Sequence, residues 1–222
     1  MTPYIASLLT FFGTLIVAGI SIYNNNITRK DSKKNNQIID LQSQKKTIEQ
    51  KINEFYIPLE HQLGYSKTLF KIFKVNKPED FRTLTFLLDK AHIYTGQTAP
   101  IVLNDNDKVL LENIITIGKK IETLIYDKSY LIGDDTEFVS AYNPGAGYES
   151  YKPKDGDMSL LSLLLSHLIT IRLASEDKLK GEKEKFEQYV FPNEFNLRIK
   201  SKLEDLRQQL INLDKQIIKL RS

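Results

Sequence analysis

The sequence contains no cysteine and no tryptophan among its 222 residues. The absence of cysteine excludes disulfide bonds, thiolate zinc sites, thiol nucleophiles and lipoprotein-type attachment, and it leaves the redox compartment open. No Walker, GxGxxG or GxSxG pattern occurs in the chain. The formal net charge is only +3, which gives no reason to expect a nucleic-acid partner.

Patterns for metal binding and acid–base chemistry are equally sparse. The three histidines, His61, His92 and His167, are far apart, and none is spaced four residues from another as helical zinc ligands are. His167 falls inside an apolar stretch, where a core histidine bonded to a neighbour is expected rather than a ligand. We therefore predict no catalytic residues, no metal and no cofactor. A hydrolase or nuclease is the remote alternative to a non-enzymatic protein.

Charged residues are missing from residues 3–23, PYIASLLTFFGTLIVAGISIY. A helix of about 20 uncharged residues can cross a hydrocarbon core of about 30 Å, and Tyr4 and Tyr23 lie where interfacial aromatic residues occur. A cleaved secretion signal would need a basic start, a shorter apolar core and a cleavage site. The pattern predicts a single-pass transmembrane helix, with residues 1–25 as the anchor.

The segment after this run, NNNITRKDSKK, is basic, and residues 26–35 are predicted to form a juxtamembrane linker. Positive charge concentrates on the cytoplasmic side, which predicts an inner (cell) membrane protein with a cytoplasmic C-terminal domain. The alternative is an extracytoplasmic domain on a signal anchor. Basic residues here and at the C-terminal end predict a collar for anionic headgroups, worth about 1 kcal/mol each; ordinary solvated lysines are the alternative. The collar consists of Arg29, Lys30, Lys33, Lys34, Lys215, Lys219 and Arg221.

Two stretches repeat apolar residues with a mean spacing of about 3.5 residues, which predicts a coiled-coil seam. The first contains Ile38, Leu41, Lys45 (in one polar slot), Ile48, Ile52, Phe55 and Leu59; the second contains Ile199, Leu203, Leu206, Leu210, Leu213, Ile217 and Leu220. Antiparallel pairing of the two seams places Ile52 opposite Leu206. We predict a stalk formed by residues 36–58 and 193–222. Two ordinary amphipathic helices of one globular bundle are the alternative.

A proline lies at the same end of each seam. Inside a helix, Pro58 loses a backbone hydrogen bond and clashes with the carbonyl of Glu54, and it disfavours the helical conformation at Ile57. Pro192 precedes the second seam. We predict that Pro58 and Pro192 are a hinge between the stalk and a head formed by residues 59–192.

The head is predicted to be a helical bundle of four segments. They cover residues 59–75, about 79–94 after the start signal NKPEDF, most of 103–133, and most of 157–181. The last is apolar from Met158 to Ile171, too short to cross a membrane and more typical of a buried central helix. Strand signals are weak throughout, so the fold class is predicted to be all-α.

Residues 133–157, GDDTEFVSAYNPGAGYESYKPKDGD, form a long predicted loop. Loops of this length are usually functional or disordered, and a disordered segment would contain few aromatic residues. Because tyrosine favours contact surfaces, we predict that Phe138, Tyr142, Tyr148 and Tyr151 contact a partner. The alternative is that these rings pack back on the bundle.

Phe55, Tyr56, Pro58 and Leu59 form FYIPL after an N-terminal span and a helical linker. This pattern resembles the Phe-Tyr-x-Pro-Leu motif of uncharacterised bacterial single-pass membrane-anchored helical proteins. The resemblance implies a bacterial origin and a similar architecture, and no catalytic residues. We expect a non-enzymatic, membrane-tethered helical protein that acts through a protein partner or as a homo-oligomer. A ligand-sensing helical domain on the same anchor is the alternative.

Overall fold

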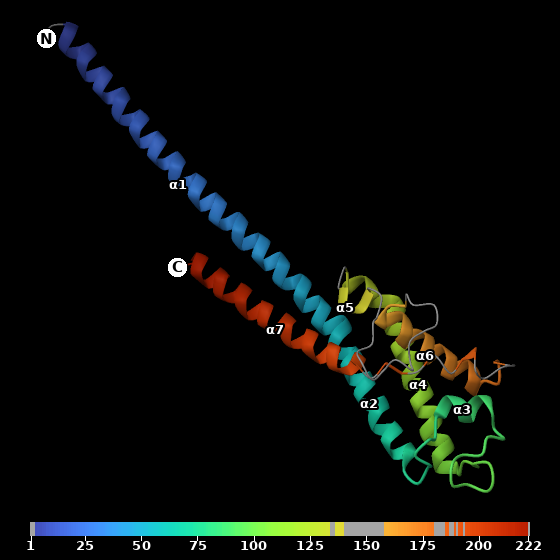
Figure 1. Cartoon of the computed structure of the whole chain (residues 1–222). Helices are drawn as coiled ribbons and strands as arrows, with labels where there is room; N and C mark the ends of the chain where they lie inside the picture. The colour runs from blue at the N-terminus through green and yellow to red at the C-terminus, as the bar shows by residue number, and fades with distance from the viewer. Residues whose placement is uncertain are drawn as a thin grey trace. The chain divides into compact units, whose positions relative to one another are not determined.

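A computed structural model of the chain describes residues 3–133, 136–139, 158–179, 185–186, 189, 191–192 and 194–221, with the backbone alone at 3–11 and 136–137. Every regular element within these residues is a helix (Figure 1), which confirms the predicted all-α class. The elements are α1 (Pro3–Lys51), the π-helix η1 (Ile52–Tyr56), α2 (Ile57–Lys74), α3 (Thr83–Leu88), α4 (Asp105–Lys128), the 3-10 helix η2 (Ser129–Leu131), α5 (Thr136–Val139), α6 (Leu160–Ser175) and α7 (Glu194–Arg221).

The chain divides into two compact units. One contains Met1–Glu49 with Gln208–Ser222, and the other contains Gln50–Arg207. The boundaries fall inside α1 and α7, and not at Pro58 and Pro192, where we predicted the hinge.

In the first unit, side chains of α1 are exposed from Phe12 to Lys33, and partial shielding begins at Lys34. From there the shielded positions recur at Ile38, Leu41 and Lys45. These are the predicted seam positions, so the sequence periodicity correctly marks the covered side of the helix.

The last part of α7 shows the matching pattern. Leu213 and Ile217 are buried, and Asp214 beside them accepts a hydrogen bond from Lys45, with 2.7 Å between Nζ and Oδ1. In the antiparallel register that pairs Ile52 with Leu206, Lys45 lies opposite Leu213, and the observed contact is with the next residue, Asp214. The contact therefore agrees with the predicted register to within one residue, and coiled-coil packing itself stays a prediction.

Among the side chains that the structure describes, which begin at Phe12, no helix is sufficiently long and apolar to span a membrane. The transmembrane helix predicted at residues 3–23 is therefore not supported by the described side chains. Residues 3–11 of that run lie outside them.

In the second unit, α2 packs on α4, α4 packs on α6, and α3 and α5 also pack on α6. Asn104 begins α4 as an N-cap, because its side chain accepts a hydrogen bond of 2.8 Å from the backbone N–H of Asp107. In α6, the apolar residues Leu160, Leu161, Leu163, Leu164 and Ala174 are buried, as predicted for a central helix, while the apolar residues from Leu165 to Leu173 are half-buried.

Aromatic rings join three of the elements in this unit. Phe55 and Tyr56 of η1 meet edge to face at 5.1 Å between ring centroids, Tyr56 lies 6.1 Å from Phe138 of α5, and Phe138 lies 5.5 Å from Phe195 of α7. All four rings are almost completely buried. Aromatic pairs at such distances add to the stabilisation from burial, so this series of rings holds the start of α7 in the core.

Pro58, predicted as a hinge, lies within a continuous helical stretch, and the expected loss of helical conformation at Ile57 does not occur. The helical chain continues from α1 through η1 into α2, and Ile57 has a helical conformation with φ −64° and ψ −51°. The π-helix accommodates the proline because its wider turn lets the N–H of Ile57 bond to the carbonyl of Ile52, five residues earlier. A local π-turn thus allows the chain to remain helical at the proline.

The helix predicted at residues 79–94 is shorter than expected. Residues 75–82 form a connection, and only Thr83–Leu88 are helical. Asn76, the first residue of the start signal NKPEDF, adopts a left-handed conformation with φ +62°. Lys77 is mostly buried, with Nζ 3.0 Å from Asp107 and 4.1 Å from the ring centroid of Phe73. The ion pair with Asp107 joins this connection to the first turn of α4.

Candidate functional site

The N-terminal part of α1 presents an uncovered apolar surface. Its described large apolar side chains are at least 40% exposed, and they are Phe12, Leu15, Ile16, Val17, Ile20, Ile22, Tyr23 and Ile27. Contiguous apolar exposure on this scale usually marks a surface that something else covers. This part of α1 is therefore the first candidate surface.

The predicted basic collar lies in the same unit. Arg29, Lys30 and Lys33 are exposed on α1, and Lys34 is partly shielded. The remaining members lie near the end of α7 and are exposed: Lys215, Lys219 and Arg221. These positions leave the basic groups accessible to solvent.

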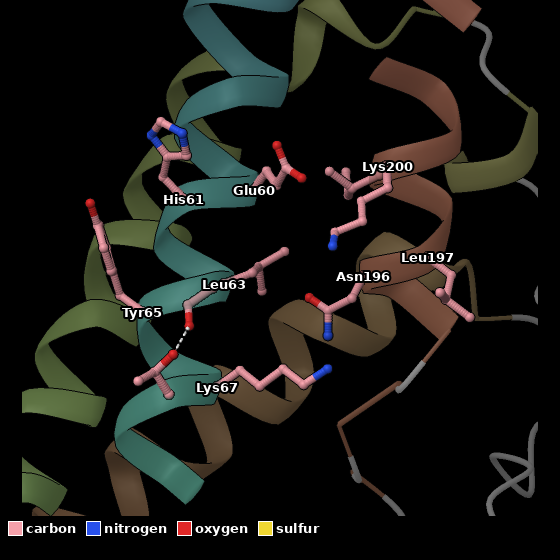
Figure 2. A pocket seen from close by; sticks show the side chains of 11 residues that line it. Glu60, His61, Leu63, Tyr65, Lys67, Asn196, Leu197 and Lys200 are labelled. Carbon is pink, nitrogen blue, oxygen red and sulfur yellow. Dashed lines mark hydrogen bonds between the residues drawn. The ribbon is translucent and has the colours of Figure 1, made fainter. Parts of the chain in front are cut away.

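A groove between α2 and the start of α7 is the second candidate surface (Figure 2). Its cavity volume is about 540 Å³. Leu63 and Ile199, both buried, line its apolar part. Gly64 lies on the α2 wall, and a Cβ added there would meet no atom within 4 Å. The glycine thus leaves open space where another residue would place a side chain.

Charged and polar side chains reach into this groove from both walls. Figure 2 shows Lys67 extending from α2 and Lys200 from α7, with the Asn196 side chain between them. Glu60 lies on the α2 wall near Lys200. Within the described part of the chain, no ion pair or hydrogen bond satisfies the side chains of these four residues.

The outer edges of the groove are apolar and strongly exposed. Tyr65 is 59% exposed on the α2 side, and Leu197 is 70% exposed on the α7 side. Large exposed side chains beside an open groove are typical of protein contact surfaces.

A second hollow of about 570 Å³ lies where α2 ends and α4 begins. Lys77 and Asp107 line it, but their charges are already paired with each other. Its exposed apolar lining residues include Ile72, Val75 and Val102. Because its charged groups are already paired with each other, this hollow discriminates less than the groove between charged and neutral binding partners.

The ionisable side chains Arg172 and His167 of α6 have structural partners within the bundle. Arg172 of α6 donates to Glu122 of α4 at 3.1–3.3 Å, and this hydrogen bonding raises the pKa of Arg172. His167 contacts the carbonyl of Tyr189 through Nδ1 at 2.8 Å, and burial lowers the pKa of its imidazole. The expectation that His167 is a bonded core histidine is confirmed. In the described residues, no group of three His, Asp or Glu side chains could hold a metal ion.

The predicted partner-contact residues divide into two groups. Phe138 is fully buried between Tyr56 and Phe195, so its prediction as a surface contact is corrected: it is a core residue. Tyr142, Tyr148 and Tyr151 lie outside the described residues. Pro192 is buried just before α7, and its carbonyl accepts from the N–H of Phe195 at 2.9 Å.

Sequence reasoning missed the groove between α2 and α7. Its polar residues are ordinary surface types separated by about 130 positions, and only the fold brings them together. The glycine at position 64, inside an otherwise regular helix, is the one local signal that could have indicated open space.

The chain matches no protein-family model, no curated protein and no solved structure. Its function is therefore inferred from its own residues.

Proposed function

We propose that this is a non-enzymatic helical protein tethered to the inner membrane by its N-terminal segment, and that it acts through protein–protein contacts. The observation that carries the tether is the uncovered apolar surface of α1 from Phe12 to Tyr23. Residues 3–23 contain no charged side chain, and an uncharged helix of this length matches the thickness of a hydrocarbon core. The exposed basic residues that follow favour a cytoplasmic C-terminal domain.

Protein contact as the mode of action is supported by the groove with its exposed edges, Tyr65 and Leu197. The titratable groups in the bundle interior are instead held by structural partners, as Arg172 is by Glu122. A binding role therefore fits the described side chains better than a catalytic one.

Fractionation of cells that express the full chain tests the tether. The wild-type protein should stay in the membrane pellet after alkaline extraction. Leu15→Lys with Val17→Lys should release it, because each central lysine costs about 2.5–3.5 kcal/mol on insertion. Ile39→Lys is the matched control, since Ile39 is exposed on the same helix but outside the apolar run, and it should leave the protein in the pellet. Wild-type protein in the soluble fraction would disprove the tether, and a C-terminal reporter active only in the periplasm would disprove the orientation.

A further inference from the structure

We propose that the groove between α2 and α7 docks a helix of a protein partner, which places an acidic side chain between Lys67 and Lys200 and an apolar side chain beside Gly64. The proposal rests on the proposed function, because it names the surface and the chemistry of the protein contact. All of the residues involved lie in the unit Gln50–Arg207.

The charge of the occupant follows from the unsatisfied groups. Lys67 and Lys200 approach the groove from opposite walls, and the Asn196 amide lies between them (Figure 2). A partner that covers these groups removes water from two cations, which is unfavourable unless the partner supplies an anion. A carboxylate accepts hydrogen bonds from both ammonium groups and from the amide N–H donors.

Glu60 makes the two ends of the groove differ in charge. It lies on the wall near Lys200, while Lys67 lies nearer the other end of the groove (Figure 2). A second acidic side chain near Glu60 would be repelled, whereas a basic or neutral one would be tolerated. The partner therefore carries its acidic residue on one part of the contact surface only.

The shape of the groove favours a protein over a small ligand. Small-molecule sites enclose most of the ligand surface, whereas the two lysines here are exposed, and the exposed side chains of Tyr65 and Leu197 point outward from the two walls (Figure 2). A partner helix that lies along the groove inserts side chains into the volume of about 540 Å³ between the two walls. The open space at Gly64 lets an apolar side chain approach the buried Leu63.

Site-specific photo-crosslinking on the full chain in membranes tests the proposal. A benzophenone amino acid at position 197 should give a crosslinked product, and the same probe at Tyr130, an exposed position of η2, should not give that product. Mass spectrometry should identify a helical partner segment that contains Asp or Glu. Lys67→Glu with Lys200→Glu should reduce the product at least tenfold.

Two controls separate docking from other effects. Lys71→Glu with Lys120→Glu makes the same change in net charge at exposed positions outside the groove, and it should leave the product unchanged. Replacing the partner's acidic residue with lysine should restore the product with the Lys67→Glu, Lys200→Glu variant. The groove variant should keep its melting temperature and remain in the membrane pellet, so a failure here is distinguishable from a failure of the tether.

Several outcomes would overturn the proposal. They are an undiminished product in the groove variant, a contact segment without acidic residues, absence of any product at position 197 in tethered protein, and a product that consists of two copies of this chain or of lipid.

Discussion

Replacing Arg172 with methionine should destabilise the bundle because it leaves Glu122 buried without a cationic partner. The Glu122 side chain is only 9% exposed, and Arg172 reaches it through Nε and a terminal nitrogen at 3.1–3.3 Å. Removing one partner of such a pair typically costs about 3–5 kcal/mol. For a chain of this size, that corresponds to a fall in melting temperature of about 6–20 °C.

Two further variants distinguish the loss of the Arg172–Glu122 ion pair from a general effect of substitutions on the helices. Lys119→Met removes a more exposed contact, in which Nζ of Lys119 on α4 lies 3.3 Å from Glu176 just after α6, and should cost at most about 1 kcal/mol. The double variant Glu122→Leu with Arg172→Met removes both buried charges. It should recover most of the loss, because apolar replacement of a buried pair is often close to neutral.

Because the chain has no tryptophan, helical circular dichroism during urea denaturation of the detergent-solubilised protein is the suitable assay. The reasoning fails if Arg172→Met lowers the free energy of unfolding by less than about 1 kcal/mol, the range of an exposed ion pair. It also fails if the double variant is as unstable as the single one.

Three other substitutions test burial and ionisation. Phe138→Ala should lower the free energy of unfolding by about 3–5 kcal/mol, measured in the same assay; a negligible loss would return Phe138 to the predicted contact surface. Burial, with nearby Asp80 and Asp89, raises the pKa of Tyr94 to about 12, so the folded state retains this proton better than the unfolded one. Stability should fall between about pH 10 and 12, and Tyr94→Phe should remove that part of the fall. Burial lowers the pKa of His167 below its usual 6.5, so stability should decrease as the pH falls through and below that value, and an unchanged pH profile in His167→Gln would contradict this.

Periodicity was the feature of the sequence that predicted most of the structure. Seam positions such as Ile38, Leu41 and Leu213 are shielded because a spacing of about 3.5 residues keeps them on one side of a helix. The cap at Asn104 was also readable, since an Asn followed by an Asp-containing first turn satisfies free N–H groups locally.

Features that depend on distant residues could not be read in this way. Residues 76–80 have the residue types that favour a helix N-terminus, but the chain does not become helical until Thr83. Lys77 in this segment instead pairs with Asp107, far along the chain, and lies over the ring of Phe73. Likewise, nothing in the local sequence of Lys67 or Lys200 indicates that the two residues share a groove. Such predictions need the fold, because the residues that decide them are far apart along the chain.

The helix continues through Pro58, and the π-turn before the proline changes which side of the helix faces the bundle. The π-turn at Ile52–Tyr56 adds about one residue to a turn, so the following residues are rotated by about 100° relative to an uninterrupted α-helix. Glu54 within this turn pairs with Lys128 at the end of α4, at 2.7 Å between Oε2 and Nζ. Beyond the turn, α2 packs on α4 with one side and lines the groove with another. The proline thus lies inside the unit Gln50–Arg207, directly after the π-turn, in the first turn of the helix whose wall carries Gly64 and Lys67.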